Sequence, residues 1–257
     1  MPVVEAVEEF RAVLRRPGWT LDEAALAIAA GADPTVQADR WLTELDRLAE
    51  GLDSFDGLIR RLFVTEGFAG NAQMYHDPRN SLLHQVLARR LGLPITLSVV
   101  CMEVGRRAGI ALEGVAMPGH FLVRHAGTDS YVDAFGGGEL LDLDGCENRF
   151  RRSTGMQIPF GEHLLPTATE PAILARILEN LRAVYRAGHP ADLEWVLRMR
   201  LALPGTGVEE VIELGEAMGR RGGWLDAAAY LESTVDSWPQ YAERLSGAAR
   251  SLRAHLN

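Results

Sequence analysis

The histidine at position 120 and the aspartate at position 133 are the residues of this sequence best placed for acid–base chemistry. His120 stands in a Pro-Gly-His-Phe turn at the start of an expected strand, and Asp133 ends the next expected strand, 131–133. If the two strands are antiparallel neighbours and the side chains share a face, the carboxylate orients the imidazole, as in the base half of a catalytic triad. The competing interpretation is that His120 only hydrogen-bonds within its turn and Asp133 only ends a strand.

A second candidate is the segment 92–98, Gly-Leu-Pro-Ile-Thr-Leu-Ser, which predicts a helix N-terminus, where thiolates and anions are stabilised. No activated nucleophile stands there, because Pro94 occupies the first turn and Thr96 and Ser98 carry ordinary hydroxyls. The competing role for these hydroxyls is capping or packing of the helix. Cys101 follows on an apolar face, and we expect it to be a buried small hydrophobe.

The loop 75–81, Tyr-His-Asp-Pro-Arg-Asn-Ser, is dense in polar groups directly before an expected helix. Two interpretations stand side by side. Asn80 and Ser81 can line a site, or Ser81 can cap the helix while the loop forms a solvated turn.

Metal chemistry has no pattern to support it. The histidines at positions 76, 84, 120 and 125 lack both the i, i+4 spacing and the His-Glu-x-x-His spacing of zinc sites. The two cysteines do not form a Cys-x-x-Cys pair. We therefore expect no metal, no disulfide and no cofactor.

Composition narrows the class of protein. The chain has 257 residues, of which 47% are hydrophobic and 24% charged, as in ordinary globular proteins. A net charge of −9 argues against a general binder of nucleic acid or anionic membranes, which relies on basic side chains. The N-terminal residues carry acid where a secretory signal carries base, and no apolar run approaches the roughly 18–20 residues of a membrane span. We expect a cytoplasmic protein.

The elements that must position these residues follow from periodicity. Helices are expected at 3–14, with Thr20 as the possible cap of the next, and then at 21–30, 35–51, 58–63, 81–92 and 94–109. A small antiparallel sheet is expected from strands at 112–117, 121–123, 131–133 and 140–141. The segment 146–166 is expected to be mostly irregular.

The C-terminal third is expected to be helical and internally repeated. The residues at 188–192 recur at 222–226, and Pro204 recurs as Pro239 about one repeat length later. A period close to 34 residues is typical of helix–turn–helix arrays, although two helical hairpins can share similar loops by chance. Two repeats cannot bury their apolar faces alone, so we expect them to dock on the preceding domain.

The run from 67 to 125, with 131–141 after it, resembles the SirB-type transglutaminase-like proteins, a bacterial family that carries tetratricopeptide-like repeats after its core. The most specific matches are 77–81, 92–98 and 118–124. The resemblance implies an α+β fold with a papain/transglutaminase-like core at 66–168. It also implies an N-terminal helical region at 1–65 packed on that core, and all-α tetratricopeptide-like hairpins at 169–257.

The wider superfamily that this chain resembles uses a Cys-His-Asp arrangement, with the cysteine in a Gly-x-Cys setting at a helix N-terminus. His120 and Asp133 match its second and third members, and Pro94 stands where the thiol would be. A triad without its nucleophile retains only residual catalysis. Acyl transfer of the cysteine type is therefore not expected.

Two hypotheses follow. In the first, a regulatory or scaffold protein binds a protein or peptide segment in a papain-like cleft, without chemistry. In the second, the chain is a hydrolase or acyltransferase in which the histidine acts as general base toward water or a nearby Thr, Ser or Cys. The predicted catalytic residues are His120 and Asp133, and the predicted cleft residues are Asn80, Ser81, Pro94, Thr96 and Ser98.

Overall fold

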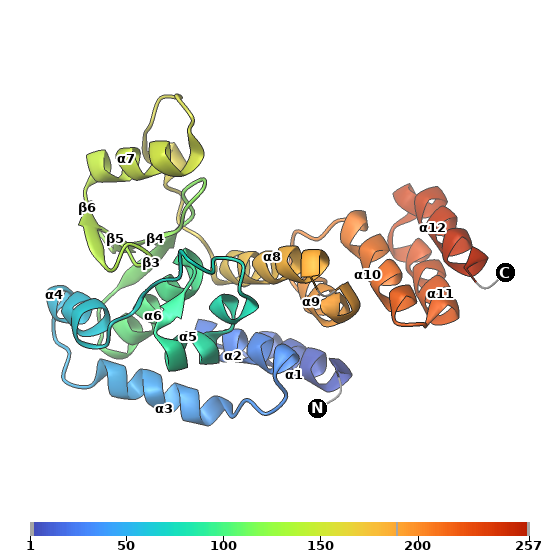
Figure 1. Ribbon diagram of the computed structural model, residues 1–257, viewed down its shortest axis with the longest axis horizontal. Helices are drawn as coiled ribbons and strands as arrows, with labels where there is room; N and C mark the ends of the chain where they lie inside the picture. The colour runs from blue at the N-terminus through green and yellow to red at the C-terminus, as the bar shows by residue number, and fades with distance from the viewer. Residues whose placement is uncertain (1–2, 189, 256–257) are drawn as a thin grey trace.

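The computed structural model describes residues 3–188 and 190–255 and shows an α+β body from which an arm of helices extends (Figure 1). The helices of the body are α1 (Val3–Arg15), α2 (Leu21–Ala32), α3 (Ala38–Ala49), α4 (Phe55–Ile59), α5 (Leu83–Arg89), α6 (Pro94–Arg107) and α7 (Leu143–Thr154). The helices of the arm are α8 (Glu170–Gly188), α9 (Leu193–Arg200), α10 (Val208–Arg220), α11 (Trp224–Thr234) and α12 (Ala242–Ala254). The expected α+β class is confirmed.

The main sheet is antiparallel and has the strand order β3-β4-β5-β6. Its strands are β3 (Leu112–Val115), β4 (Leu122–His125), β5 (Tyr131–Asp133) and β6 (Glu139–Leu141). A second, parallel sheet pairs β1 (Ala69–Gly70) with β2 (Leu91–Gly92). The small antiparallel sheet expected from the sequence is therefore confirmed, with each strand beside its neighbour in the chain.

The N-terminal helices begin at residues whose side chains favour a helix start. The Thr20 N–H donates to Oε2 of Glu23 over 3.0 Å, within a capping box that starts α2. The third helix begins at Ala38, later than expected, because both the N–H and the hydroxyl of Thr35 donate to Oδ1 of Asp33 in a preceding turn. After α4 the chain continues as a π-helical segment, Arg60–Thr65.

The expectation that Ser81 caps the next helix is wrong. Ser81 is buried in a 3₁₀ turn, Pro78–Ser81, which is capped by Asp77, and α5 starts after it. α5 ends early because Arg90 has a φ of 59°, after which β2 pairs with β1. Pro94 occupies the first turn of α6, as expected.

The expectation that 146–166 is mostly irregular is also wrong, because α7 covers its first part. Asp142 caps α7 by accepting the Gly145 N–H over 2.8 Å. Gly155 ends it with a left-handed φ of 70°. Cys146 and Phe150 are the buried residues of α7, so the helix has few apolar residues by which its sequence could be recognised.

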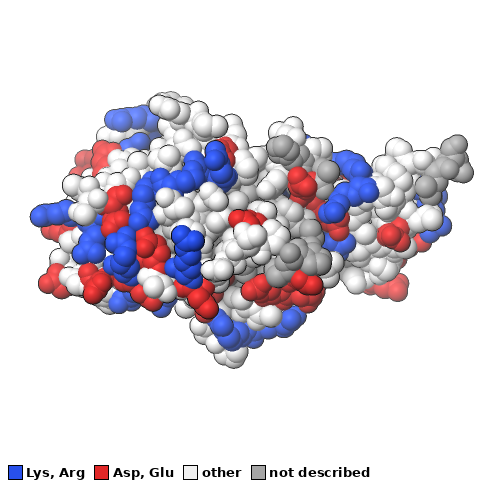
Figure 2. All heavy atoms as spheres, turned by 60° about the horizontal axis from the view of Figure 1, so that its bottom comes forward, with Lys and Arg blue, Asp and Glu red and all other residues white. Residues whose placement is uncertain are grey.

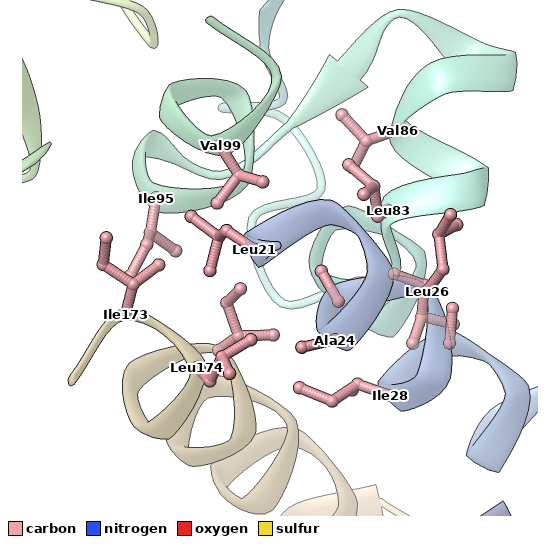
Figure 3. Close-up of a cluster of buried hydrophobic side chains, with 14 of the residues drawn as sticks. Leu21, Ala24, Leu26, Ile28, Leu83, Val86, Ile95, Val99, Ile173 and Leu174 are labelled. Carbon is pink, nitrogen blue, oxygen red and sulfur yellow. The ribbon is translucent and has the colours of Figure 1, made fainter. Parts of the chain in front are cut away.

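One buried apolar cluster extends from α1 to α10 and joins the N-terminal helices, α5, α6 and the start of the arm. Figure 3 shows α2 at its centre, with side chains from α5, α6 and α8 directed toward it. The labelled members are Leu21, Ala24, Leu26, Ile28, Leu83, Val86, Ile95, Val99, Ile173 and Leu174. Each fully buried aliphatic side chain contributes about 1.5–3 kcal/mol, so this cluster fixes α6 against α2 and α8.

The arm docks on the body through its first two helices. Leu178 of α8 and Val196 of α9 belong to the cluster of the body, whereas Leu231 and Leu245 belong to a separate cluster within α10–α12. The domain boundaries predicted near 65 and 168 and the tetratricopeptide assignment stay predictions. On the face shown in Figure 2, acidic and basic side chains are interspersed, and every basic one is arginine because the sequence has no lysine.

Candidate functional site

A tight turn fixes the position of the imidazole. Gly119 has a φ of +74°, a left-handed value that favours glycine, and the His120 N–H donates to the Met117 carbonyl over 3.0 Å. Proline at the second position and glycine at the third are typical of a type II turn, which explains the Pro118-Gly119 pair. The turn places His120 just before β4, beside the strand that ends at Asp133.

His120 and Asp133 are in direct contact. Nε2 of His120 lies 2.8 Å from Oδ1 of Asp133. The two residues are 7% and 0% exposed. The contact predicted from the sequence is confirmed, although His120 also closes its own turn. Because an ionised carboxylate can only accept, Nε2 is the donor, and Nδ1 of the neutral ring is left as an acceptor without a hydrogen-bond partner among the described residues.

The Asp133 carboxylate is held in its ionised form. Burial alone raises its pKa, but the hydrogen bond and charge of His120, the Gly136 N–H at 2.9 Å from Oδ1, and the charge of Arg149 together bring the pKa below 3.8. Nη2 of Arg149 lies 2.9 Å from Oδ2. Oδ2 accepts no hydrogen bond of good geometry from the described residues, so this contact is an ion pair.

Arg149 contacts Asp133 at the candidate site and was not predicted from the sequence. It projects from α7, in the segment that was expected to be irregular. The signals that could have revealed this helix are Asp142 before it and Gly155 after it, a cap pair at the right spacing.

The hydroxyls near the start of α6 are engaged in structural hydrogen bonds. Oγ1 of Thr96 donates to the Asn80 carbonyl over 2.6 Å and accepts from the Leu93 N–H over 3.0 Å. Oγ of Ser98 donates to the Pro94 carbonyl over 2.7 Å. Thr96 and Ser98 are 1% and 0% exposed. Capping and packing account for both side chains.

The two thiols are buried and protonated near neutral pH. Burial raises the pKa of Cys101 to about 12, and burial with the nearby Asp142 and Asp133 carboxylates raises the pKa of Cys146 to about 12. Both residues are 0% exposed. Neither has the character of a nucleophile.

Asn80 organises the loop before it. Its Oδ1 accepts from Nδ2 of Asn71 over 3.0 Å and from Nη1 of Arg89 over 3.3 Å. Its Nδ2 donates to the carbonyls of Met74 and Tyr75 at 2.7 and 3.3 Å. Asn80 is itself fully buried, so its side chain stabilises this loop from the protein interior.

The predicted site residues therefore form two groups. Backbone hydrogen bonds of Gly70 and Asn71, called the bridge below, link the two groups. His120 and Asp133 form one group, and Asn80, Pro94, Thr96 and Ser98 form a bonded group at the start of α6, with Ser81 buried next to Asn80 in the chain.

In the bridge, the Asn71 N–H donates to the Gly92 carbonyl over 3.1 Å, and the Gly70 N–H donates to the Phe135 carbonyl over 3.2 Å. The Phe135 ring stands edge-on to the His120 ring, with centroids 6.2 Å apart.

Other features of the surface lie away from this site. Two cavities, of about 560 Å³ beside α3 and about 470 Å³ between α6 and β3, are lined by none of the predicted site residues. Within residues 3–188 and 190–255, no three His, Cys, Asp or Glu side chains are grouped so that they could hold a metal ion. In the same part of the chain, no helix is both long and apolar enough to cross a membrane.

The fold and the paired histidine and aspartate can now be compared with known protein families. A family model described as the transglutaminase-like superfamily matches residues 23–179. This match covers more than half of the chain, which therefore belongs to the transglutaminase-like superfamily. No solved structure matches the chain.

Among curated proteins, a UPF0162 protein of Xylella fastidiosa is 42% identical over 187 residues, which are 67% of this chain and 65% of the relative. A UPF0162 protein of Pseudomonas aeruginosa is 36% identical over 182 residues, 66% of this chain and 67% of the relative. Human F-box only protein 21 is 39% identical over 116 residues, 41% of this chain and 18% of that protein. The chain thus spans just under two thirds of the Xylella relative.

Proposed function

We propose that this chain is a transglutaminase-like protein of the SirB type that binds a protein or peptide segment beside the His120–Asp133 pair, in a regulatory or scaffold role. The observation that supports the proposal is that His120 and Asp133 are arranged like the base and the orienting residue of a catalytic triad, while no nucleophile accompanies them among the described residues. The imidazole is oriented and the carboxylate is ionised, yet Pro94 stands at the helix start. The C-terminal helices, which we assign to tetratricopeptide-like repeats, add a docking surface.

Acyl transfer through a protein nucleophile is poorly supported by the neighbouring groups. Thr96 and Ser98 donate their hydroxyl protons to backbone carbonyls, and both thiols are buried with raised pKa values. A nucleophile needs a base within hydrogen-bond reach, and none of these groups has His120 as its partner. This combination favours binding over chemistry.

The surroundings of His120 favour a ligand with apolar side chains. Met74 and Tyr75 are 58% and 45% exposed, and the Tyr75 ring stands edge-on to Phe135 with centroids 5.9 Å apart. Phe135 in turn contacts His120. Exposed aromatic and methionine side chains beside a buried polar acceptor are typical of peptide-binding surfaces. The likeness to 18% of human F-box only protein 21 fits a module used within a larger protein.

A second function is favoured by one observation, the unpartnered Nδ1 of His120. An imidazole oriented by an ionised carboxylate can take a proton from water, so a hydrolase that attacks with water remains the alternative. In that case activity would require His120 and would be independent of both cysteines.

Selection from a random peptide library tests the binding proposal. We expect the wild-type protein to select peptides from the library. These peptides should bind the Tyr75→Ala variant about tenfold or more weakly than the wild type, because an aromatic contact is lost. Val4→Ala, which changes a residue 63% exposed on α1, is the matched control and should bind as wild type does. Peptides that bind the Tyr75 variant equally well would contradict the proposal. Hydrolysis of the peptides or of nitrophenyl esters that disappears in His120→Ala would establish the alternative.

A further inference from the structure

Arg176 of α8 is a half-buried arginine that has no anionic partner in residues 3–188 and 190–255. Its guanidinium carbon lies 5.7 Å from the centroid of the Phe121 ring. Among the described residues it has no ion pair and no hydrogen bond to its side chain. Arg61 also lacks a carboxylate, but it donates to two backbone carbonyls. The other described arginines without an ion pair are exposed, at positions 15, 40, 60, 152 and 250.

The rest of the chain shows how unusual this is. Arg107, with 13% of its side chain exposed, pairs with Asp22 at 2.5 Å and with Asp46 at 2.7 Å. Arg182, with 15% exposed, contacts Glu213 and Glu179. A guanidinium that loses water without gaining an anionic partner destabilises the fold, and the contact with the Phe121 ring offsets only part of this cost. Arg176 stays protonated although burial lowers its pKa. The free cation is therefore available to an anion from outside the chain.

Arg176 belongs to the surroundings of the His120 site. Phe121, over which it lies, is the residue after His120. Tyr75 lies near enough to Arg176 for its hydroxyl, if ionised, to raise the pKa of Arg176, and the Tyr75 ring contacts Phe135, which contacts His120. Arg176 is thus connected to His120 through Phe121, the next residue in the chain, and Tyr75 is connected to His120 through the Phe135 ring. Tyr75 is 45% exposed, so part of this group lies at the surface.

We infer that Arg176 binds a carboxylate of the peptide segment held beside His120. This inference rests on the proposed function and adds the charge of the ligand. A planar guanidinium matches a carboxylate with two parallel hydrogen bonds. A phosphate, with a charge near −2, would call for further cations. Arg149, which lies against Asp133, is already paired with Asp133 and with Glu139.

The test uses three small probes and the Nε–H signal of Arg176 in nitrogen-15 NMR spectra, assigned by its loss in Arg176→Gln. The probes are N-acetylglycine, with a terminal carboxylate, N-acetylglutamate α-amide, with a side-chain carboxylate, and N-acetylglutamine α-amide, which is neutral. We expect saturable shifts with one or both acids and none with the neutral amide. A response to N-acetylglycine alone would assign the ligand as a peptide C-terminus, and a response to the glutamate amide alone as an acidic side chain.

Arg152→Gln is the matched control, because it removes an exposed arginine that has no ion pair among the described residues. It should leave the shifts unchanged, while Arg176→Lys should retain binding weakened about tenfold by loss of the paired hydrogen bonds. Shifts that are equal for acids and neutral amide, absent for all probes, or weakened as much by Arg152→Gln would overturn the inference.

Selected peptides separate this inference from the function on which it rests. A peptide that loses affinity in Tyr75→Ala but binds Arg176→Gln at full strength would refute the carboxylate site and leave peptide binding intact. Peptides that lose about tenfold in Arg176→Gln, and in their own amidated or Glu→Gln forms, would support both.

Discussion

Arg149→Gln should destabilise the protein through the carboxylate that it leaves unpaired. Arg149 is the contact of Oδ2 in Asp133, a residue that is 0% exposed, so the variant leaves a buried charged oxygen without a partner. Its other contact, Glu139, has a side chain that is 54% exposed and contributes little. We expect a loss of about 2–3 kcal/mol near neutral pH, below the roughly 3–5 kcal/mol of a fully buried pair because Arg149 is itself partly exposed.

The pH dependence of this loss follows from linkage. The folded-state pKa of Asp133 lies below its ordinary value, so ionised Asp133 contributes stability above the unfolded pKa and loses it as pH falls through the folded pKa. Removing Arg149 removes one cause of the lowering. The difference between variant and wild type should therefore be full at neutral pH and shrink as the pH falls below 3.8, the ordinary value.

Thermal unfolding measures the effect, and Arg152→Gln on the same helix is the control. The Arg149 variant should melt roughly 5–10 °C lower, whereas the exposed control should change by less than about 0.5 kcal/mol. In an Asp133→Asn background, Arg149→Gln should cost little, because no buried charge is left to pair. Equal losses in the Arg149 and Arg152 variants, or an undiminished loss in the Asn background, would refute this reasoning.

Three further predictions concern the start of α6 and the bridge. Pro94→Cys should give a thiol whose rate of alkylation by iodoacetamide rises with pH and reaches half its maximum below about pH 7.5. Adding His120→Ala should raise this midpoint by about one pH unit. A midpoint near 8.5 both with and without His120 would contradict the prediction. Cys101 in the wild type should be alkylated only as fast as the protein unfolds, since it is 0% exposed with a pKa of about 12, and fast labelling of folded protein would argue against this. Gly70→Ala should cost about 1–3 kcal/mol in an unfolding titration, because its Cβ would lie 2.5 Å from the Phe135 ring; an unchanged midpoint would disprove the close approach.

The site could be predicted from the sequence where its signals are local. Pro118 and Gly119 predict a turn at a fixed position, and the following strands pair with their neighbours in the chain. This pattern left the contact open, and the resemblance to the transglutaminase-like motif led us to pair His120 with Asp133 before the fold was known. Arg149 could not be found in this way. It is one of 26 arginines, and only the packing of α7 brings it to Asp133.

In the fold, too, the elements with local sequence signals could be predicted, and those that depend on distant contacts could not. Helices that are buried on most sides, such as α2 and α6, were predicted at nearly the observed positions, because their apolar composition and their start signals agree with their burial. α7 was missed because most of its residues are polar, and it is positioned by Cys146 and Phe150 against the outer face of the sheet. The early end of α5 depends on β2 pairing with β1, a contact that no local pattern encodes.

The energetics of the His120–Asp133 pair bear on its role. Tyr131, two residues before Asp133 on β5 and therefore on the same face of the sheet, is 2% exposed and belongs to a buried apolar cluster, so an apolar residue at position 133 would have apolar neighbours. A buried ionised carboxylate instead requires His120, Gly136 and Arg149 to offset its desolvation, and such networks are often no more stable than apolar packing. Stability alone therefore does not explain the network. The network secures the orientation of the imidazole, whose Nδ1 can accept a hydrogen bond from a ligand or a proton from water.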